Sequence, residues 1–135
     1  MRYSPLDSEL AILDTLSAEE RLHYATTRII ESEEVWSLGD DNGWRIRDRD
    51  DKQLISIWPY RQLVLEHCSG NPESPLPQST SLEHFVYAVL DMCQTNDIWL
   101  EIFPNPNEPG YIISSSDLYE ILNGMLENNE YFIEG

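Results

Sequence analysis

The chain has 135 residues, of which 41% are hydrophobic, and it carries a formal net charge of −17. This length and apolar content support one domain with its own core and exclude a compositionally disordered chain. No apolar run approaches the roughly 20 residues of a membrane span, and the negative charge disfavours binding to nucleic acid or to an anionic membrane. Residues 1–7 lack the apolar core of a signal peptide, so we expect a cytoplasmic protein.

The charge is distributed unevenly along the chain. All eight Lys and Arg residues lie at or before Arg61, whereas residues 62–135 contain twelve Asp or Glu residues and no Lys or Arg. A field of this sign repels polyanions and attracts cationic partners. The pattern therefore favours a positively charged binding partner, with general solubility as the alternative explanation.

The first predicted elements are helical. Residues 1–16 are predicted to form an N-terminal arm or a short helix, separate from a single domain over residues 17–135. Ser17 and Glu20 fit a capping box, in which each side chain bonds the other residue's backbone N–H. The helix that follows is predicted to end at about Ser32, because its apolar residues recur at helical spacing.

Three strands are expected next, over 34–38, 43–48 and 53–58. Asn42-Gly43 predicts a hairpin turn between the first two, and the polar residues 48–52 predict a second turn. In the second strand, Trp44 and Ile46 should share one face. Pro59 then fits the first turn of a helix that Gly70 ends.

The second half is predicted to contain two helices and two strands. The proline-rich residues 70–80 are expected to form a loop, followed by a helix to about residue 94 that begins with a Thr80–Glu83 capping box. Strands are expected at 98–103 and 111–114, and the serines at 114–116 should cap a last helix. The sequence thus predicts an α+β fold with a mainly antiparallel sheet of about five strands covered by helices.

The acidic run at residues 40–51 has a composition that could suit a calcium-binding loop. Such a loop needs oxygen ligands at its odd positions and a glycine at position six. Counting back from Gly43 puts Leu38 at position one, and starting at Asp48 puts Lys52 at position five. Neither register provides the ligands, so we interpret the run as two hairpin turns and expect no metal site.

Candidate reactive groups are few. The spacing of His23, His67 and His84 does not suit shared metal binding on one helix. Cys68 and Cys93 are expected to be reduced and buried, and no motif supports a catalytic pairing of either with His84. Phosphate-binding and dinucleotide-binding glycine motifs are also missing, so no cofactor is expected.

Several motifs together resemble a known bacterial family, the domain of unknown function 2750, over about residues 17–125. The family pattern combines a V-W-x-L strand, an acidic turn before a glycine and an aromatic residue, a W-P helix start and a late glycine. The matching positions are Val35, Trp36, Leu38, Asp41, Gly43, Trp44, Trp58, Pro59 and Gly110. Ser56 stands where the family often has proline. The second half is also faintly similar to the N-terminal domain of type III secretion enhancer proteins. Neither resemblance implies a catalytic residue.

Charge and the lack of a catalytic motif predict a non-enzymatic acidic binding protein. Its most specific form is a bacterial immunity protein or antitoxin that neutralises a basic toxin such as a nuclease. The partner-binding residues predicted for it are Asp91, Asp97, Glu101, Glu108, Glu120, Glu127 and Glu130.

The alternative is an accessory or regulatory domain that holds a peptide or small ligand in a groove lined by Trp44, Trp58 and Trp99. An unrecognised hydrolase is the third hypothesis. It would require a buried His–Cys or His–carboxylate pair within hydrogen-bond reach.

Overall fold

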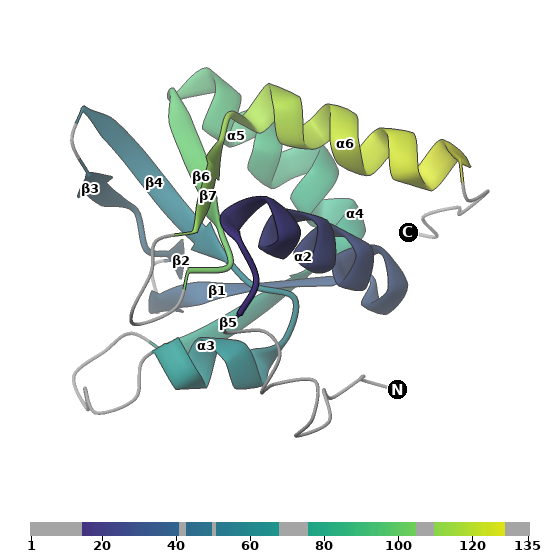
Figure 1. Cartoon of the computed structure of the whole chain (residues 1–135). Coiled ribbons are helices and arrows are strands. Elements are labelled where there is room, and N and C mark those ends of the chain that lie inside the picture. Colours follow the sequence, from purple (N-terminus) through teal and green to yellow (C-terminus); the bar gives the residue numbers. More distant parts are fainter. Residues whose placement is uncertain (1–14, 41–42, 50, 68–75, 105–109, 129–135) are drawn as a thin grey trace.

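A computed structural model describes residues 15–40, 43–49, 51–67, 76–104 and 110–128. Helices and strands of these segments form one α+β arrangement, as expected (Figure 1). Its elements are α2 (Ala18–Ser32), β1 (Glu34–Asp40), β2 (Gly43–Trp44), β3 (Arg47–Arg49), β4 (Lys52–Ile57), α3 (Arg61–His67), β5 (Leu76–Ser81), α4 (Leu82–His84), the π-helical segment η1 (Phe85–Val89), α5 (Leu90–Thr95), β6 (Ile98–Ile102), β7 (Tyr111–Ile113) and α6 (Ser115–Asn128).

The strands form two sheets, one with the order β2-β1-β5 and one with the order β3-β4-β6-β7. All neighbours are antiparallel except β4 and β6, which are parallel. Trp36 and Trp58 join the sheets through two reciprocal backbone hydrogen bonds, of 2.9 and 2.8 Å. The mainly antiparallel character is confirmed, but the strands are more numerous than the expected five and are divided between two sheets.

The strand expected at 43–48 is divided in two. Its first part, β2, pairs with β1, and its second part, β3, pairs with β4 of the other sheet. The chain changes sheets between them, and Ile46 is 43% exposed there rather than buried on the face of Trp44. The hairpin pairing of Asp40 with Gly43 is present, while residues 41 and 42 lie outside the described residues.

Part of the segment expected to be a loop is a strand. β5 pairs with β1 from Glu34–Ser81 to Gly39–Leu76, with Pro77 opposite Leu38. Proline lacks a backbone N–H and is therefore tolerated on an edge strand, which is the position of β5 in its sheet. The prolines therefore led to the prediction of a loop, although an edge strand can contain them.

Serine side chains cap α2, α4 and α6. The predicted box before α2 is confirmed, because the Glu20 N–H donates to Ser17 Oγ at 3.2 Å and the Ser17 N–H donates to Glu20 Oε1 at 2.9 Å. Before α4 the cap is Ser81, which accepts from the His84 N–H at 3.1 Å, so the box predicted one residue earlier is wrong. Ser114 caps α6, as expected.

The main core lies between the four-stranded sheet and the helices α2, α5 and α6, while α3 packs on β1 and β5 away from α6 (Figure 1). Strand residues Ile55, Leu100 and Ile113 meet Leu118 and Leu122 of α6 in one buried cluster. Alternation along β6 and β7 then turns Trp99, Glu101 and Ile112 to the opposite face of the sheet. We call this opposite face the outer face. Within the described residues, no helix has the length and apolarity needed to cross a bilayer.

Candidate functional site

The seven predicted acidic contacts do not form one group. Asp91, Asp97, Glu120 and Glu127 are exposed, whereas Glu101 is 1% exposed. Glu108 and Glu130 lie outside the described residues. The prediction that Glu101 contacts a partner is therefore wrong, because its side chain is not at the surface.

The Glu101 carboxylate is bound on all sides by its own protein. Arg47 of β3 pairs with Oε1, and Ser56 Oγ of β4 donates to the same oxygen at 3.1 Å. The backbone N–H of Gly110 donates to Oε2 at 3.0 Å. A Cβ at Gly110 would lie 2.3 Å from the Ile102 carbonyl oxygen, so glycine is needed for this close approach. Glu101 therefore connects β6 to β3 and β4 on the outer face, which is a structural role.

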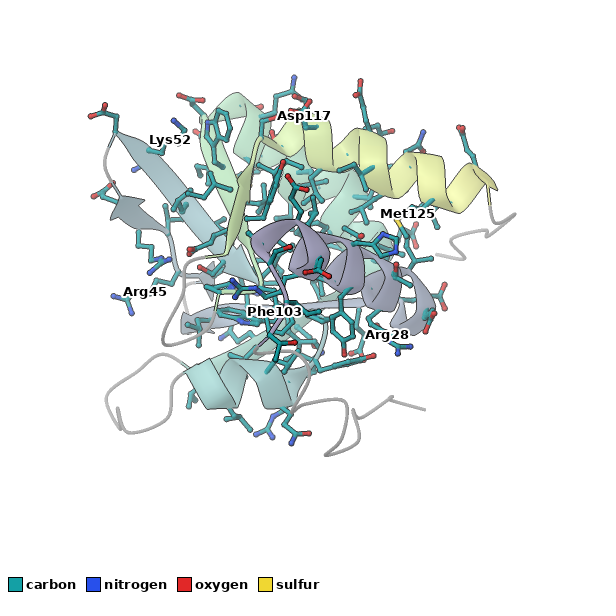
Figure 2. All side chains as sticks on the ribbon, in the orientation of Figure 1. Arg28, Arg45, Lys52, Phe103, Asp117 and Met125 are labelled. Atoms are coloured by element: carbon teal, nitrogen blue, oxygen red, sulfur yellow. The ribbon has the colours of Figure 1, made fainter. Side chains whose placement is uncertain are left out.

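The exposed acids of α6 have different surroundings. Asp117, Glu120 and Glu127 follow one another at intervals of three and seven residues, so they share the helix face opposite Leu118 and Leu122. Within the described residues, the carboxylates of Asp117 and Glu120 accept no hydrogen bond and form no ion pair. The Glu127 carboxylate accepts a hydrogen bond from Asn123 Nδ2 at 3.3 Å. Asp117 lies in the first turn of α6 (Figure 2). We call these three residues the α6 acidic face.

The three tryptophans proposed to line a groove do not share one. Trp58 is 0% exposed, and its indole Nε1–H donates to the Pro104 carbonyl oxygen at 2.9 Å. Trp44 packs on Phe85 of η1, with ring centroids 6.1 Å apart. Of the three, Trp99 alone lines the groove described next, so the sequence-based grouping of these side chains is wrong.

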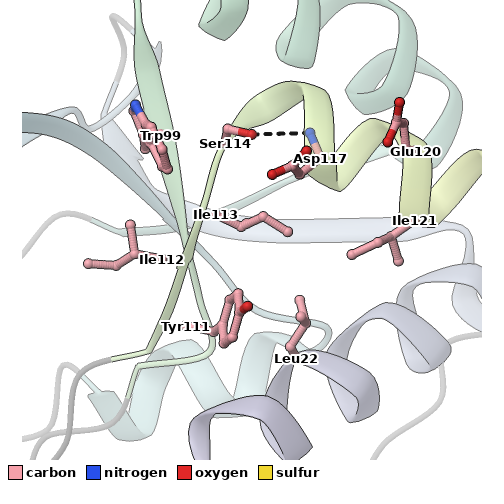
Figure 3. A pocket seen from close by; sticks show the side chains of 9 residues that line it. All are labelled: Leu22, Trp99, Tyr111, Ile112, Ile113, Ser114, Asp117, Glu120 and Ile121. Atoms are coloured by element: carbon pink, nitrogen blue, oxygen red, sulfur yellow. Dashed lines mark hydrogen bonds between the residues drawn. The ribbon is translucent and has the colours of Figure 1, made fainter.

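A groove of about 460 Å³ does exist elsewhere, where α2, β6, β7 and α6 meet (Figure 3). Its walls combine aliphatic and aromatic side chains with two carboxylates. The lining residues are Leu22, Trp99, Tyr111, Ile112, Ile113, Ser114, Asp117, Glu120 and Ile121. Two members of the α6 acidic face therefore border a hollow whose lining is partly apolar and partly polar.

The groove follows the edge of the sheet. Ile112 projects to one side of β7 and Ile113 to the other, and both line the same hollow (Figure 3). Because neighbouring strand residues point to opposite faces, a hollow that reaches both must pass along the strand's edge. β7 is the last strand in the order β3-β4-β6-β7, so this is the edge that faces away from β6.

Trp99 forms the aromatic wall on the outer face, and a cation of the protein already lies on it. The Lys52 ammonium nitrogen is 4.8 Å from the centroid of the Trp99 ring. This distance is within the range of a cation–π interaction. The outer side of the groove therefore has a positive charge close to its aromatic surface, in contrast to the carboxylates on the α6 side.

Reactive chemistry finds little support in the described residues. Among them, no group of three His, Cys, Asp or Glu side chains is placed to hold a metal ion. Cys93 is buried, and burial raises the pKa of its thiol to about 11, which disfavours the nucleophilic thiolate. His84 and Cys93 are nine residues apart along continuous helix, or about two turns, which is too far for a catalytic pair. Cys68 lies outside the described residues.

The fold is that of a small α+β protein with a buried carboxylate, Glu101, and with exposed carboxylates that border a groove on α6. Comparison with known families gives a match over residues 22–122 to the family described as Protein of unknown function (DUF2750). This protein belongs to that family, and the matched segment extends from α2 into α6 and includes the groove. No curated protein and no solved structure matches the chain. The similarity to type III secretion enhancer proteins stays a prediction.

Proposed function

We propose that this protein binds a positively charged protein partner without catalysing a reaction, and that the α6 acidic face receives it. The observation that carries the proposal is the state of Asp117 and Glu120, whose carboxylates are exposed and unpaired within the described residues. Residues 62–135 provide no Lys or Arg to neutralise them. The negative charge of Asp117 and Glu120 is therefore available to attract a partner, whereas that of Glu101 is neutralised by Arg47.

The physical advantage of such a face is fast and oriented association. Opposite fields steer two proteins together and fix their register, and steering raises association rates by about 10- to 1000-fold at low salt. An immunity protein or antitoxin that must reach a basic toxin quickly is the form of this function that fits best. A nuclease is a suitable target, because its nucleic-acid site is itself cationic.

A second candidate function uses the same region of the molecule. The groove beside Trp99 has an apolar lining and convergent polar groups, which are the usual properties of a ligand site. This supports an accessory or regulatory domain that holds a peptide. The two functions differ in whether the carboxylates or the apolar lining provide most of the affinity.

Association kinetics of two charge-reversed variants test the proposal. The probe is the cationic protein that the wild type retains from a lysate of the native host at low and moderate salt. Glu120→Lys with Glu127→Lys should lower its association rate constant about tenfold at low salt, because both substitutions reverse the α6 field. Asp48→Lys with Asp51→Lys makes the same change in charge at exposed positions of the β3–β4 hairpin and should have a much smaller effect.

Two results would contradict the proposal. One is failure of the wild type to retain any cationic protein. The other is an equal loss of association rate in both double variants, which would show that total charge rather than the α6 acidic face matters. Circular dichroism of both variants controls for the fold.

A further inference from the structure

We propose that the free edge of β7 accepts an extended basic segment of the partner as an additional strand, with cationic and apolar side chains in alternation. This inference rests on the proposed function and specifies the chemistry that the groove recognises. Three features carry it: the edge position of β7, the assignment of the groove walls to the two faces of the sheet, and the charge on each wall.

The first feature is the strand edge. β7 pairs with β6 on one side, and its other side has no strand neighbour within the described residues. The backbone groups of such an edge can bond an incoming strand, which is the basis of β-strand addition in peptide recognition. Ile112 in the middle of β7 is 37% exposed, so an apolar side chain marks this edge at the surface.

The second feature is the register of the walls. Tyr111 and Ile113 pair with core-facing residues of β6, whereas Ile112 pairs with Glu101 of the outer face. An added strand continues the same alternation, so its residues beside Tyr111 and Ile113 would lie on the core-facing side of the sheet, which α2 and α6 border. The residue between them would face the outer wall formed by Ile112 and Trp99.

The third feature is the charge on each wall. Asp117 and Glu120 border the groove on the α6 side (Figure 3). Lys52 lies over Trp99 on the outer side, where a second cation would be repelled. The walls therefore select the pattern cation, apolar, cation in the incoming strand.

The same charges disfavour a second copy of this chain as the occupant. Pairing two β7 edges would place Asp117 and Glu120 of one copy near those of the other. Each copy also has a net charge of −17, which opposes self-association at low salt. A basic segment neutralises these carboxylates and covers Ile112.

The test uses labelled hexapeptides and fluorescence anisotropy with the full chain. A blocked peptide of alternating lysine and valine should bind, and its glutamate–valine counterpart should not. Two further peptides carry N-methyl groups on all lysines or on all valines. Successive N–H groups of a strand point to opposite edges, so strand addition requires that one of the two methylated peptides loses binding and the other retains it. Equal behaviour of the two would overturn the inference.

Matched variants locate the site. Asp117→Asn with Glu120→Gln should weaken the lysine–valine peptide about three- to tenfold, while Asp48→Asn with Asp51→Asn, the same change in charge outside the groove lining, should leave its affinity unchanged. Ile112→Arg should weaken it about tenfold or more, and Met92→Arg, at a similarly exposed position on α5, serves as its control. If a variant and its control weakened peptide binding equally, the peptide would not bind at the β7 edge.

The peptide and partner experiments can fail independently. If charge reversal on α6 slows the cationic partner but the lysine–valine peptide does not bind, the edge site is wrong and the proposed function stands. If the peptide binds at β7 but no cationic protein is retained, the partner proposal is wrong and the edge site stands. Self-association that Ile112→Arg abolishes would instead identify a second copy as the occupant and overturn the inference.

Discussion

Glu101 and Glu120 lie on elements that pack together, β6 and α6, yet their carboxylates have opposite surroundings. Glu101 is buried and bound by Arg47, Ser56 and the Gly110 N–H. Glu120 is exposed and borders a groove, with no hydrogen bond or ion pair to the described residues. The comparison shows that a high acidic content can combine two separate properties, because one carboxylate holds strands together while another remains available to a partner.

The largest effect should come from removing the cation that pairs with Glu101. We expect Arg47→Met to lower the free energy of unfolding by about 3 kcal/mol, because it leaves a buried carboxylate without its charge partner. This is the low end for a buried pair, since the Arg47 side chain is 38% exposed. Urea denaturation monitored by tryptophan fluorescence measures the change.

Two controls sharpen this comparison. Glu120→Ala on the α6 acidic face should change stability by less than about 0.5 kcal/mol, as expected for a surface residue beyond the first helical turn. Arg47→Met combined with Glu101→Met should recover much of the loss, because no uncompensated charge then stays buried. If Arg47→Met and Glu120→Ala shifted the urea midpoint equally, Glu101 would have no special role in the fold.

A second effect concerns the buried thiol of Cys93, measured in a Cys68→Ser background. With a pKa of about 11 in place of 9.0, Cys93 has about one hundredth of the usual thiolate at pH 8. Burial also blocks access, so we expect Ellman's reagent to label the native protein at least about 100-fold more slowly than the urea-unfolded protein. Rapid labelling without urea would show that Cys93 is accessible and would revive its candidacy as a reactive group.

The smallest effect should appear at an exposed carboxylate that does have a structural partner. Hydrogen bonds from the Ser17 backbone N–H and hydroxyl lower the pKa of Glu20 below its usual 4.5. A lowered folded-state pKa stabilises the fold above the unfolded-state value, and this contribution is lost as pH falls through the folded-state pKa. Between pH 6 and pH 3, wild type should therefore lose slightly more stability than Glu20→Gln.

Urea titrations at several pH values measure this difference. Ser17→Ala should give an intermediate result, because it removes the hydroxyl and keeps the backbone N–H that bonds Glu20. Identical pH profiles of wild type and Glu20→Gln would show that the capping carboxylate contributes nothing to acid stability.

The sequence predicted those features that depend on neighbouring residues. The Ser17–Glu20 box and the Ser114 cap were predictable because each bond joins residues three apart. β5 was missed because prolines oppose a central strand, and nothing local shows that the strand lies at a sheet edge next to β1. Local chemistry therefore predicted the caps of α2 and α6, placed the cap of α4 one residue too early, and did not predict how the strands are shared between sheets.

The candidate site was predictable in composition but not in position. Glu120 and Trp99 were identified as contact residues and Asp117 was not, whereas the groove depends on α2, β6, β7 and α6 meeting in space. Alternation in residues 98–102 could have placed Trp99 and Glu101 on one face. The burial of Glu101 could not be predicted in this way, because Arg47 and Ser56 reach it from distant parts of the chain.

The parallel pairing of β4 with β6 has a consequence for synthesis on the ribosome. Between β4 and β6 the chain contributes β5 to the other sheet. The paired residues Ile57 and Ile102 are therefore far apart in the sequence. Contacts so distant along the chain form slowly and require most of the polypeptide. A nascent chain that ends before residue 98 can form the β3–β4 hairpin but lacks the strand that covers the other edge of β4, so the larger sheet is completed only after β6 and β7 have emerged.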